Sequence, residues 1–477
     1  MAESLGHKAT TGAIWASIDR FGIMVLQFVV NLILARLLLP QDFGAVGMLA
    51  IFIAVSQVLI DGGFGSALIQ KKEPTQTDYS TILFWNIGFS SVLYLILFIC
   101  APVISEFFSM PILSDVLRVM GLSLIINSVF GIQKNRLQKQ LAFKLIAIME
   151  LSSYVIGAVV AITLAYYGFG VWSLVAMQIV SGLTSVLTLW LITHWLPSIC
   201  FSLASMKELF GFGGFILAAG LLQEICKNLQ GIIIGRKFSA TEMGYFSQAY
   251  KLDQIACYSI PQVIVQVMYP VYSSIQDDKQ RLIEILSMNI RVISFLIFPI
   301  LSMLILIGEP LIQFLYGEKW LPSVPYFQVL CVGGFFICLQ NVNFYAVAAV
   351  GKSKQLFFWS FYKWGFLILA LLVGMVFGMY GILWGMVLSN FNIYAVNAYL
   401  AARNVGMKLR LQTKCLLPIT IATTIAFAIG YACLFYVGSF IMGAIAFLAV
   451  YISICFLFHY KAMKESLLLI ERLIHRT

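Results

Sequence analysis

Long apolar runs recur along the whole 477-residue chain, separated by short polar breaks. Only 10% of the residues are charged and 61% are hydrophobic, whereas soluble domains carry about 25% charged residues. A membrane-spanning helix needs about 20 mostly apolar residues and satisfies its own backbone hydrogen bonds. The pattern therefore predicts an all-α polytopic membrane protein with about 14 transmembrane helices, and it argues against a string of soluble domains.

The breaks between the runs carry helix-ending residues such as Pro40, Pro111 and Pro197. With the N-terminus inside, twenty-two of the thirty Lys and Arg residues fall on the inner side, Lys363 among them, five on the outer side and three within spans. This bias predicts cytoplasmic N- and C-termini. The net charge of +10 then reflects topology and attraction to anionic lipid heads, and we expect no nucleic-acid partner. The predicted spans are 10–38, 44–68, 79–105, 112–132, 145–167, 170–192, 207–235, 244–272, 286–308, 322–349, 356–378, 380–402, 413–436 and 439–460.

A motif that returns 200 residues later divides the chain into halves. Residues 33–44 read ILARLLLPQDFG and residues 233–244 read IIGRKFSATEMG. The inner loop at 140–143 resembles 355–358, and the turn at 168–175 resembles 379–387, in the same order along each half. Three ordered matches indicate an internal duplication, in which Arg36 corresponds to Arg236, Asp42 to Glu242 and Gly44 to Gly244.

Six spans per half require the halves to be parallel, a known transporter plan. The duplication therefore predicts two pseudo-symmetric six-helix lobes around a central cavity, with two extra helices. The predicted divisions are a first lobe at 1–195, a linker at 196–206, a second lobe at 207–405, and helices 13 and 14 with a cytoplasmic amphipathic tail at 406–477.

Polar side chains follow one face of the first span of each lobe. At 100° per residue, Arg20, Gln27 and Asn31 share a face of the first span, and Gln223, Lys227 and Gln230 share a face of the span at 207–235. Intramembrane polar groups are costly and often functional, so we interpret these six residues as a substrate-binding cavity lining. The alternative is interhelical polar contacts, in which Glu224 pairs with Lys227 and Asp19 with a neighbour.

Other charged residues near the membrane have two interpretations each. Asp19, Asp61 and Glu224 are candidates for ion coupling, although Asp61 lies in DGGFG and could cap or hinge a helix end. The remaining four are candidate contacts at the outer rim. Of these, the two arginines could instead complement helix C-terminal dipoles, and the other two could snorkel to the interface. These four residues are Arg36, Arg236, Lys251 and Asp253.

No motif for catalysis, phosphate binding or metal binding accompanies these residues. The nine cysteines include no CxxC pair, and the four histidines lie at span ends or in the tails. No phosphate loop, HExxH or serine elbow is present in the sequence. We therefore expect a protein that is not an enzyme, with no catalytic residue, metal or cofactor beyond a coupling proton or sodium ion.

Several stretches resemble one family. The N-terminal segment 12–48 (GAIWASIDRFGIMVLQFVVNLILARLLLPQDFGAVGM), DGGFGSALIQ at 61–70, LQKQLAFKLIAIMEL at 137–151 and YYGFGVWSLVAMQ at 166–178 resemble the polysaccharide-transport branch of the multidrug/oligosaccharidyl-lipid/polysaccharide exporter superfamily. Its Wzx-type members are repeat-unit flippases of O-antigen, capsule and exopolysaccharide synthesis. The resemblance spans essentially the whole chain and is weaker in the last two spans.

The resemblance implies a flippase of the bacterial inner membrane. Its expected substrate is a polyprenyl-pyrophosphate-linked oligosaccharide, moved from the inner to the outer leaflet by alternating access and coupled to an ion gradient. Membrane lipids and the polysaccharide polymerase and export machinery are the other expected partners. The alternatives are a peptidoglycan-precursor lipid flippase or a multidrug antiporter of the same superfamily and, from another class, a membrane glycosyltransferase or ligase.

Overall fold

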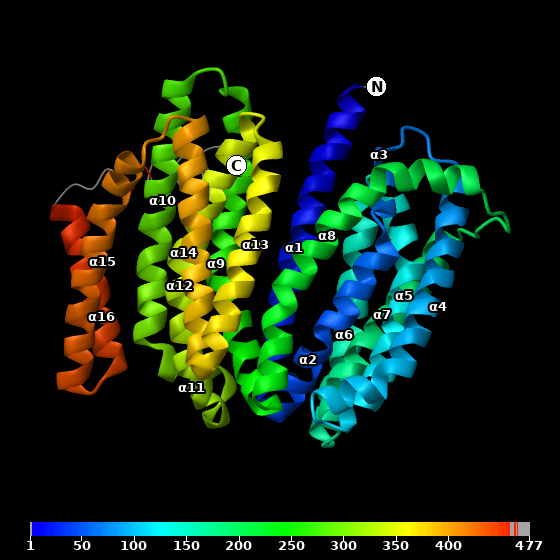
Figure 1. Ribbon diagram of the computed structural model, residues 1–477, viewed down its shortest axis with the longest axis horizontal. Helices are drawn as coiled ribbons and strands as arrows, with labels where there is room; N and C mark the ends of the chain where they lie inside the picture. Colours follow the sequence, from blue (N-terminus) through cyan, green and yellow to red (C-terminus); the bar gives the residue numbers. More distant parts are fainter. Residues whose placement is uncertain (1, 458–461, 464, 466–477) are drawn as a thin grey trace. The chain divides into compact units, whose positions relative to one another are not determined.

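Helices joined by short turns make up the described part of the chain, and no strand occurs in it. The computed structural model describes residues 2–457, 462, 463 and 465, without the side chains of 2–14, 16–19, 211–216, 219, 258–260 and 262–267. Most of the predicted tail helix therefore lies outside the described residues. The chain divides into two compact units, Met1–Gly244 and Tyr245–Thr477 (Figure 1).

The helices of the first unit are α1 (Ala2–Leu37), α2 (Pro40–Asp61), α3 (Phe64–Gln70), α4 (Gln76–Phe107), α5 (Ile112–Lys139), α6 (Phe143–Tyr166), α7 (Val171–Thr193) and α8 (Leu203–Lys237). The second unit contains α9 (Ala240–Ser274) apart from its first residues, α10 (Lys279–Leu306), α11 (Gly308–Tyr316), the 3-10 helix η1 (Glu318–Ser323), α12 (Val324–Ala349), α13 (Ser353–Val376), α14 (Gly378–Asn404), α15 (Leu409–Val437) and α16 (Phe440–Leu457).

Each predicted span corresponds to one long helix, and the second span continues into the short helix α3. Eleven helical segments within the described residues are long and apolar enough to cross a membrane. The long helices α8, α9 and α14 are not among the eleven, and α8 carries three of the six polar stripe residues that the sequence singles out. The polytopic all-α prediction is confirmed, with the count of 14 spans as an approximation.

Hydrogen bonds tie the segment before α8 to the start of α4. The Trp195 indole donates to Gln76 Oε1 at 2.7 Å, and the backbone N–H groups of Ser198 and Ser202 donate to the hydroxyls of Ser80 and Thr81. Helix α8 then packs on α2, α3 and α4, so it belongs to the first compact unit. The predicted lobe boundaries follow the repeat rather than these contacts, and they stay a prediction.

An ion pair joins the start of α8 to the loop between α3 and α4. Lys71 Nζ lies 3.0 Å from Glu208 Oε2 and 3.1 Å from Asp78 Oδ2. The hydrogen bond to Glu208 raises the pKa of Lys71 above its ordinary value. Asp78 also accepts the Thr75 backbone N–H at 2.8 Å and so completes the N-terminal cap of α4. One buried carboxylate therefore serves both the helix start and the contact with α8.

The repeated motif forms the same structure in both copies: a long helix, a two-residue turn and a second helix. Helix α1 ends at Leu37 and α2 begins at Pro40, while α8 ends at Lys237 and α9 begins at Ala240. The caps also occupy equivalent positions. The Asp42 carboxylate accepts the Leu39 N–H at 2.9 Å, and the Ser239 hydroxyl accepts the Glu242 N–H at 3.1 Å. The turns therefore arise from equivalent local sequences.

The two copies of the motif contact each other reciprocally within the first unit. A Cβ atom added to Gly44 would overlap the backbone carbonyl of Ala240, and one added to Gly244 would overlap that of Pro40. Ala240 and Pro40 are themselves equivalent positions of the repeat. Each hairpin thus presents the same surface to the other, which is the pattern of an isologous, two-fold contact. Glycine is required because the backbones touch.

The helices that follow the motif pack in the same order in both units. In the first unit α4 packs on α5, α5 on α7 and α6 on α7; in the second α10 packs on α12, α12 on α14 and α13 on α14. The last two helices, α15 and α16, form a hairpin beside α10 (Figure 1). Gly430 and Gly443 meet in this hairpin, and the Tyr451 hydroxyl donates to the Phe295 carbonyl at 3.0 Å. This hairpin is the predicted addition to the two six-helix sets.

We predict that Gly44→Ala and Gly244→Ala each lower the stability of the purified protein by about 1–3 kcal/mol, because the added methyl group overlaps a backbone carbonyl that cannot rotate away. Thermal unfolding in detergent measures the effect. Gly88→Ala is the matched control, since a Cβ there meets no atom within 4 Å and α4 is helical at that point. Equal melting temperatures for all three variants would contradict the reciprocal contact.

Candidate functional site

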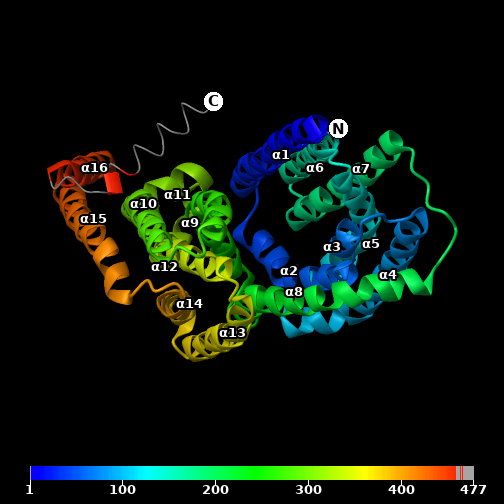
Figure 2. The same cartoon turned by 90° about the horizontal axis from the view of Figure 1, so that it is seen from above.

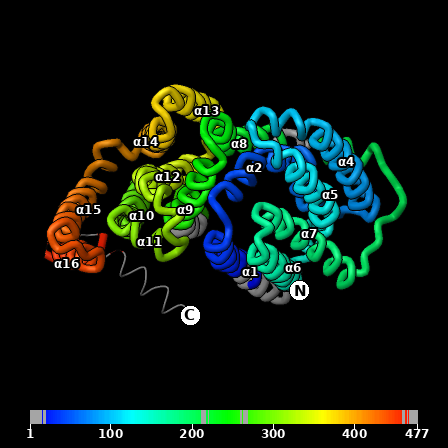
Figure 3. The backbone as a smooth tube through the Cα atoms, turned by 90° about the horizontal axis from the view of Figure 1, so that it is seen from below, coloured from blue at the N-terminus to red at the C-terminus, as the bar shows by residue number. Residues whose placement is uncertain are grey.

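The predicted stripe on α1 is presented at the surface of the first unit. Arg20 and Gln27 are exposed and Asn31 is partly exposed. Helix α1 packs on α6, where Leu151 lies against Gly22, and this places the two helices side by side (Figure 3). An exposed arginine within an apolar helix is available to bind an anion.

Only part of the corresponding stripe on α8 is exposed. Gln223 and Lys227 are exposed, whereas Gln230 is 7% exposed and donates to the carbonyl of Lys227 in its own helix. Helix α2 lies between α1 and α8 in the first unit (Figure 2). The structure thus leaves Arg20, Gln27, Gln223 and Lys227 available as candidate binding groups and gives Gln230 a partner within α8.

The two acidic residues next to these stripes are Glu224 on α8 and Asp19 on α1. Glu224 accepts a hydrogen bond from Asn228 Nδ2 at 2.9 Å, so its described partner is Asn228 and not Lys227. This neutral amide was missed in the sequence, where only charged partners were considered. The side chain of Asp19 lies outside the described residues.

Asp61 lies at a break between two helices. Helix α2 ends at Asp61, Gly62 and Gly63 follow with φ of 54° and 73°, and α3 begins at Phe64. The Asp61 carboxylate accepts the backbone N–H of Gly65 in the first turn of α3. Positive φ at both glycines lets the chain turn without steric cost. These contacts fit the capping interpretation of Asp61.

The two equivalent arginines lie in the last turns of their helices, Arg36 in α1 and Arg236 in α8. A cation at this position complements the partial negative charge of a helix C-terminus. The Arg236 guanidinium also lies 5.1 Å from the centroid of the Phe107 ring. The geometry fits the structural interpretation of the pair, and contact with a substrate stays a prediction.

Lys251 and Asp253 were placed together at the outer rim, and the structure separates their surroundings. Lys251 is exposed, but Asp253 is only 1% exposed. Asp253 Oδ1 accepts the Cys257 thiol at 2.9 Å, and the thiol lies against Gly334 of α12. Asp253 is therefore an interior residue of the second unit, and its rim role stays untested.

Two of the cations counted on the inner side, Lys363 and Arg291, lie inside helices. Arg291 is in α10, where its Nε donates to Glu465 Oε2 at 2.9 Å. Lys363 is in α13, only 6% exposed, and its Nζ donates to Asn397 Oδ1 at 2.6 Å. Both therefore lie within helices and not in loops, and the side of the membrane assigned to them stays a prediction. The signal was present, because each lies within a predicted span, at 286–308 and 356–378.

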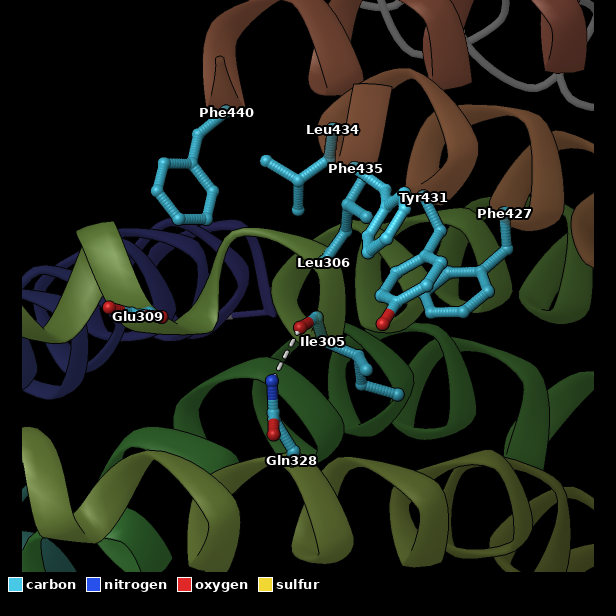
Figure 4. Close-up of a pocket in the computed structure, with 9 residues that line it drawn as sticks. All are labelled: Ile305, Leu306, Glu309, Gln328, Phe427, Tyr431, Leu434, Phe435 and Phe440. Carbon is cyan, nitrogen blue, oxygen red and sulfur yellow. Dashed lines mark hydrogen bonds between the residues drawn. The ribbon is translucent and has the colours of Figure 1, made fainter. Parts of the chain in front are cut away.

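Two adjoining pockets lie between the α15–α16 hairpin and the rest of the second unit. The first has a volume of about 480 Å³, and Figure 4 shows Gln328 at its base donating to the Ile305 carbonyl at 3.0 Å. The second, of about 490 Å³, shares Ile305 and Phe427 with it. Most of its lining is apolar or aromatic, with three threonines and a serine as the polar exceptions. Such a surface suits a hydrocarbon chain better than a charged ligand.

Long apolar helices in two repeated sets, with exposed polar groups on the membrane helices, define a multi-pass membrane transporter. The family described as "Polysaccharide biosynthesis protein" matches residues 33–325. The chain belongs to this family, and the resemblance to the polysaccharide branch of the exporter superfamily is confirmed.

Curated relatives match about three quarters of the chain. The teichuronic acid biosynthesis protein TuaB of Bacillus subtilis (strain 168) is 26% identical over 75% of this chain and 74% of its own length. The lipopolysaccharide biosynthesis protein WzxC of Escherichia coli (strain K12) is 25% identical over 78% and 76%. The succinoglycan biosynthesis transport protein ExoT of Rhizobium meliloti (strain 1021) is 26% identical over 76% and 73%. All three names concern the biosynthesis of a saccharide polymer.

Solved structures share the fold. The lipid II flippase MurJ in an inward closed conformation aligns over 94% of this chain and 99% of its own, with a TM-score of 0.73 and 14% identity. An inward-facing multidrug resistance transporter of the MATE family aligns over 80% and 95%, with a TM-score of 0.61 and 14% identity. At this identity the likeness supports the transporter fold alone.

Two substitutions separate the capping and coupling interpretations of Asp61. We expect Asp61→Ala to lower stability by about 1 kcal/mol, because Gly65 loses its acceptor. Asp61→Asn retains an acceptor oxygen but cannot carry a proton, so we expect near-normal stability and normal polysaccharide export. Thermal unfolding and export by a complemented deletion strain are the measurements. Abolished export in a well-folded Asp61→Asn protein would assign the coupling role instead.

Proposed function

We propose that this protein is a flippase for polyprenyl-pyrophosphate-linked polysaccharide repeat units in the bacterial inner membrane. It moves them from the inner to the outer leaflet without making or breaking a covalent bond. Membership of the polysaccharide family and the names of the bacterial relatives support the saccharide class. The distribution of Lys and Arg supports cytoplasmic termini.

The observation that carries the proposal is the pair of exposed cations on the first helices of the two repeats. Arg20 lies on α1 and Lys227 on α8, each beside an exposed glutamine of the same helix. A guanidinium binds a phosphate through two parallel hydrogen bonds, and an ammonium binds it as a point charge. The two side chains suit the pyrophosphate, and Gln27 and Gln223 suit sugar hydroxyls.

Exposed polar side chains on membrane helices solve the physical problem of moving a sugar head. Each unpaired polar group of the head would cost several kcal/mol in hydrocarbon. A polar surface within the protein keeps these groups hydrogen-bonded while the head crosses. The same need explains why Arg20 is tolerated in the apolar part of α1 and Lys227 within α8.

The apolar pockets beside α15 suit the other end of the substrate. Phe298, Phe335 and Phe336 line the second pocket together with aliphatic side chains. An isoprenoid chain has no hydrogen-bonding group, and aromatic and branched aliphatic side chains give it dispersion contacts without a polar cost. A division of labour between polar helices for the head and apolar pockets for the tail fits an amphiphilic substrate.

Alternating access would present Arg20 and Lys227 to one leaflet and then to the other. Movement of the substrate in one direction requires an energy source, and a proton or sodium gradient is our proposal. Asp19, Asp61 and Glu224 remain candidate coupling residues, and the polymerase and export machinery are candidate partners that take the flipped unit.

We predict that Arg20→Ala and Lys227→Ala each reduce polysaccharide export by about tenfold or more, since a charge-assisted hydrogen bond contributes about 1.5–3 kcal/mol. Export is measured in a deletion strain complemented with each variant, with protein levels checked in isolated membranes. The same strain should accumulate the lipid-linked oligosaccharide in the inner leaflet.

Exposed apolar neighbours provide matched controls. Phe21 and Ile225 are exposed on the same helices, so Phe21→Ala and Ile225→Ala should export normally. Normal export by both the Arg20 and Lys227 variants would refute the pyrophosphate role. Complementation of a drug-sensitive strain by the wild type, without any effect on polysaccharide, would favour the multidrug alternative.

A further inference from the structure

Lys363 is a buried lysine in the middle of an apolar helix. Helix α13 begins at Ser353, and ten residues at about 1.5 Å each place Lys363 about 15 Å along it. The helix ends at Val376, so Lys363 lies near its middle. The side chain is 6% exposed. A charge at this depth is costly and is a functional hypothesis by default.

The described partners of the Lys363 ammonium are neutral. Its Nζ donates to Asn397 Oδ1 at 2.6 Å and lies 5.8 Å from the centroid of the Phe344 ring. Asn397 is itself held by a hydrogen bond from its Nδ2 to the Gln340 carbonyl, at 3.0 Å. The lysine therefore contacts an amide oxygen and the negative face of an aromatic ring, both of which favour a cation.

Helices α12 and α14 pack against α13 within the second unit. Helix α12 contributes Gln340 and Phe344, and α14 contributes Asn397. The titratable groups on these helices include two phenols: Tyr362 of α13 donates to Asn392 Oδ1 at 3.2 Å, and Tyr399 of α14 has a ring contact with Trp359. Among the described residues no carboxylate forms an ion pair with Lys363.

Helix α12 also carries two buried amide oxygens that accept no hydrogen bond in the described structure. They are Gln340 Oε1 and Asn343 Oδ1. Asn343 Nδ2 lies 3.3 Å from Gln412 Oε1 of α15. An anion needs donors, and α12 offers two spare oxygens here, against one unpaired donor, Nδ2 of Asn392 on α14. The cluster therefore suits a proton or a cation rather than a phosphate.

The absence of a counter-ion makes both protonation states of Lys363 accessible. A lysine paired with a buried carboxylate would leave an uncompensated charge if it lost its proton, and that would cost several kcal/mol. When Lys363 loses its proton, its described hydrogen-bond partner is a neutral amide and no charge is left unpaired. An arginine could not serve in this way, because a guanidinium does not lose its proton in proteins.

We propose that Lys363, held by Asn397, is the proton-binding site that couples this transporter to the proton gradient. The ammonium releases one proton to water on one side of the membrane, and the resulting amine takes one proton from the other side. Only an N–H bond breaks and re-forms. The inference rests on the proposed flippase function and adds the coupling step to it.

The test uses the purified full-length protein in liposomes with a fluorescent polyprenyl-pyrophosphate-linked oligosaccharide. Two rates are measured: exchange of the lipid between leaflets at equal pH, and its net accumulation in one leaflet under an imposed pH gradient. Lys363→Met cannot bind a proton and Lys363→Arg cannot release one. We expect both variants to retain exchange and to lose gradient-driven accumulation.

Two further variants complete the test. Lys354 is exposed near the start of the same helix, so Lys354→Met should retain both rates. Asn397→Asp places a carboxylate against the ammonium and holds its proton, so it should lose accumulation while retaining the lysine. This variant tests the same step if neither Lys363 variant folds.

The outcomes separate the two proposals. Accumulation retained in Lys363→Met, in Lys363→Arg or in a folded Asn397→Asp would overturn the coupling role. Loss of exchange together with accumulation in folded variants would assign Lys363 to structure or substrate binding and overturn it as well. A wild-type protein that exchanges no lipid-linked oligosaccharide would instead overturn the proposed function, and the inference with it.

Discussion

The direct backbone contact between the two copies of the helix hairpin organises the first unit. In lipid, helices gain little from burying apolar side chains, so close van der Waals contact and small residues hold them together. Gly44 and Gly244 allow the start of α2 and the start of α9 to touch through their carbonyls. The same contact fixes the end of α8, which then packs along α2. Two glycines at equivalent positions therefore allow the two copies of the hairpin to pack directly against each other.

Hydropathy and the internal repeat predict most of the fold, because both are patterns along the sequence that do not depend on tertiary contacts. Every predicted span is a helix, and the capped turns recur at equivalent residues. The packing of α8 within the first unit could not be predicted in this way. It depends on the bonds of Trp195, Ser198 and Ser202 to α4, which are tertiary contacts between short polar residues. The break at Asp61 was visible as a glycine pair, but its closure by the Gly65 N–H required coordinates.

The sequence indicates which polar residues share a helix face, but it does not indicate which side chains surround them. A face calculation finds the stripe on α1, since exposure follows the helix period there. The same calculation groups Gln230 with Lys227, although Gln230 donates to a carbonyl within α8. The count of Lys and Arg residues placed Lys363 on the inner side of the membrane. Such a count uses only the position of a residue along the chain and takes no account of the side chains that surround it. Neutral amides such as Asn397 and Asn228 carry no charge signal, and they complete the surroundings of Lys363 and Glu224.

The cations of this protein differ chiefly in what faces them, and this difference sorts their chemistry. Arg291 is held by Glu465, so its charge is fixed and serves to join α10 to the residues after α16. Arg20 and Lys227 are exposed, so their charges are available to a mobile anion. Lys363 is buried among amide oxygens and an aromatic ring, so its charge can be lost without leaving another charge unpaired. Under the proposed function, these three kinds of cation would serve structure, substrate binding and energy coupling respectively.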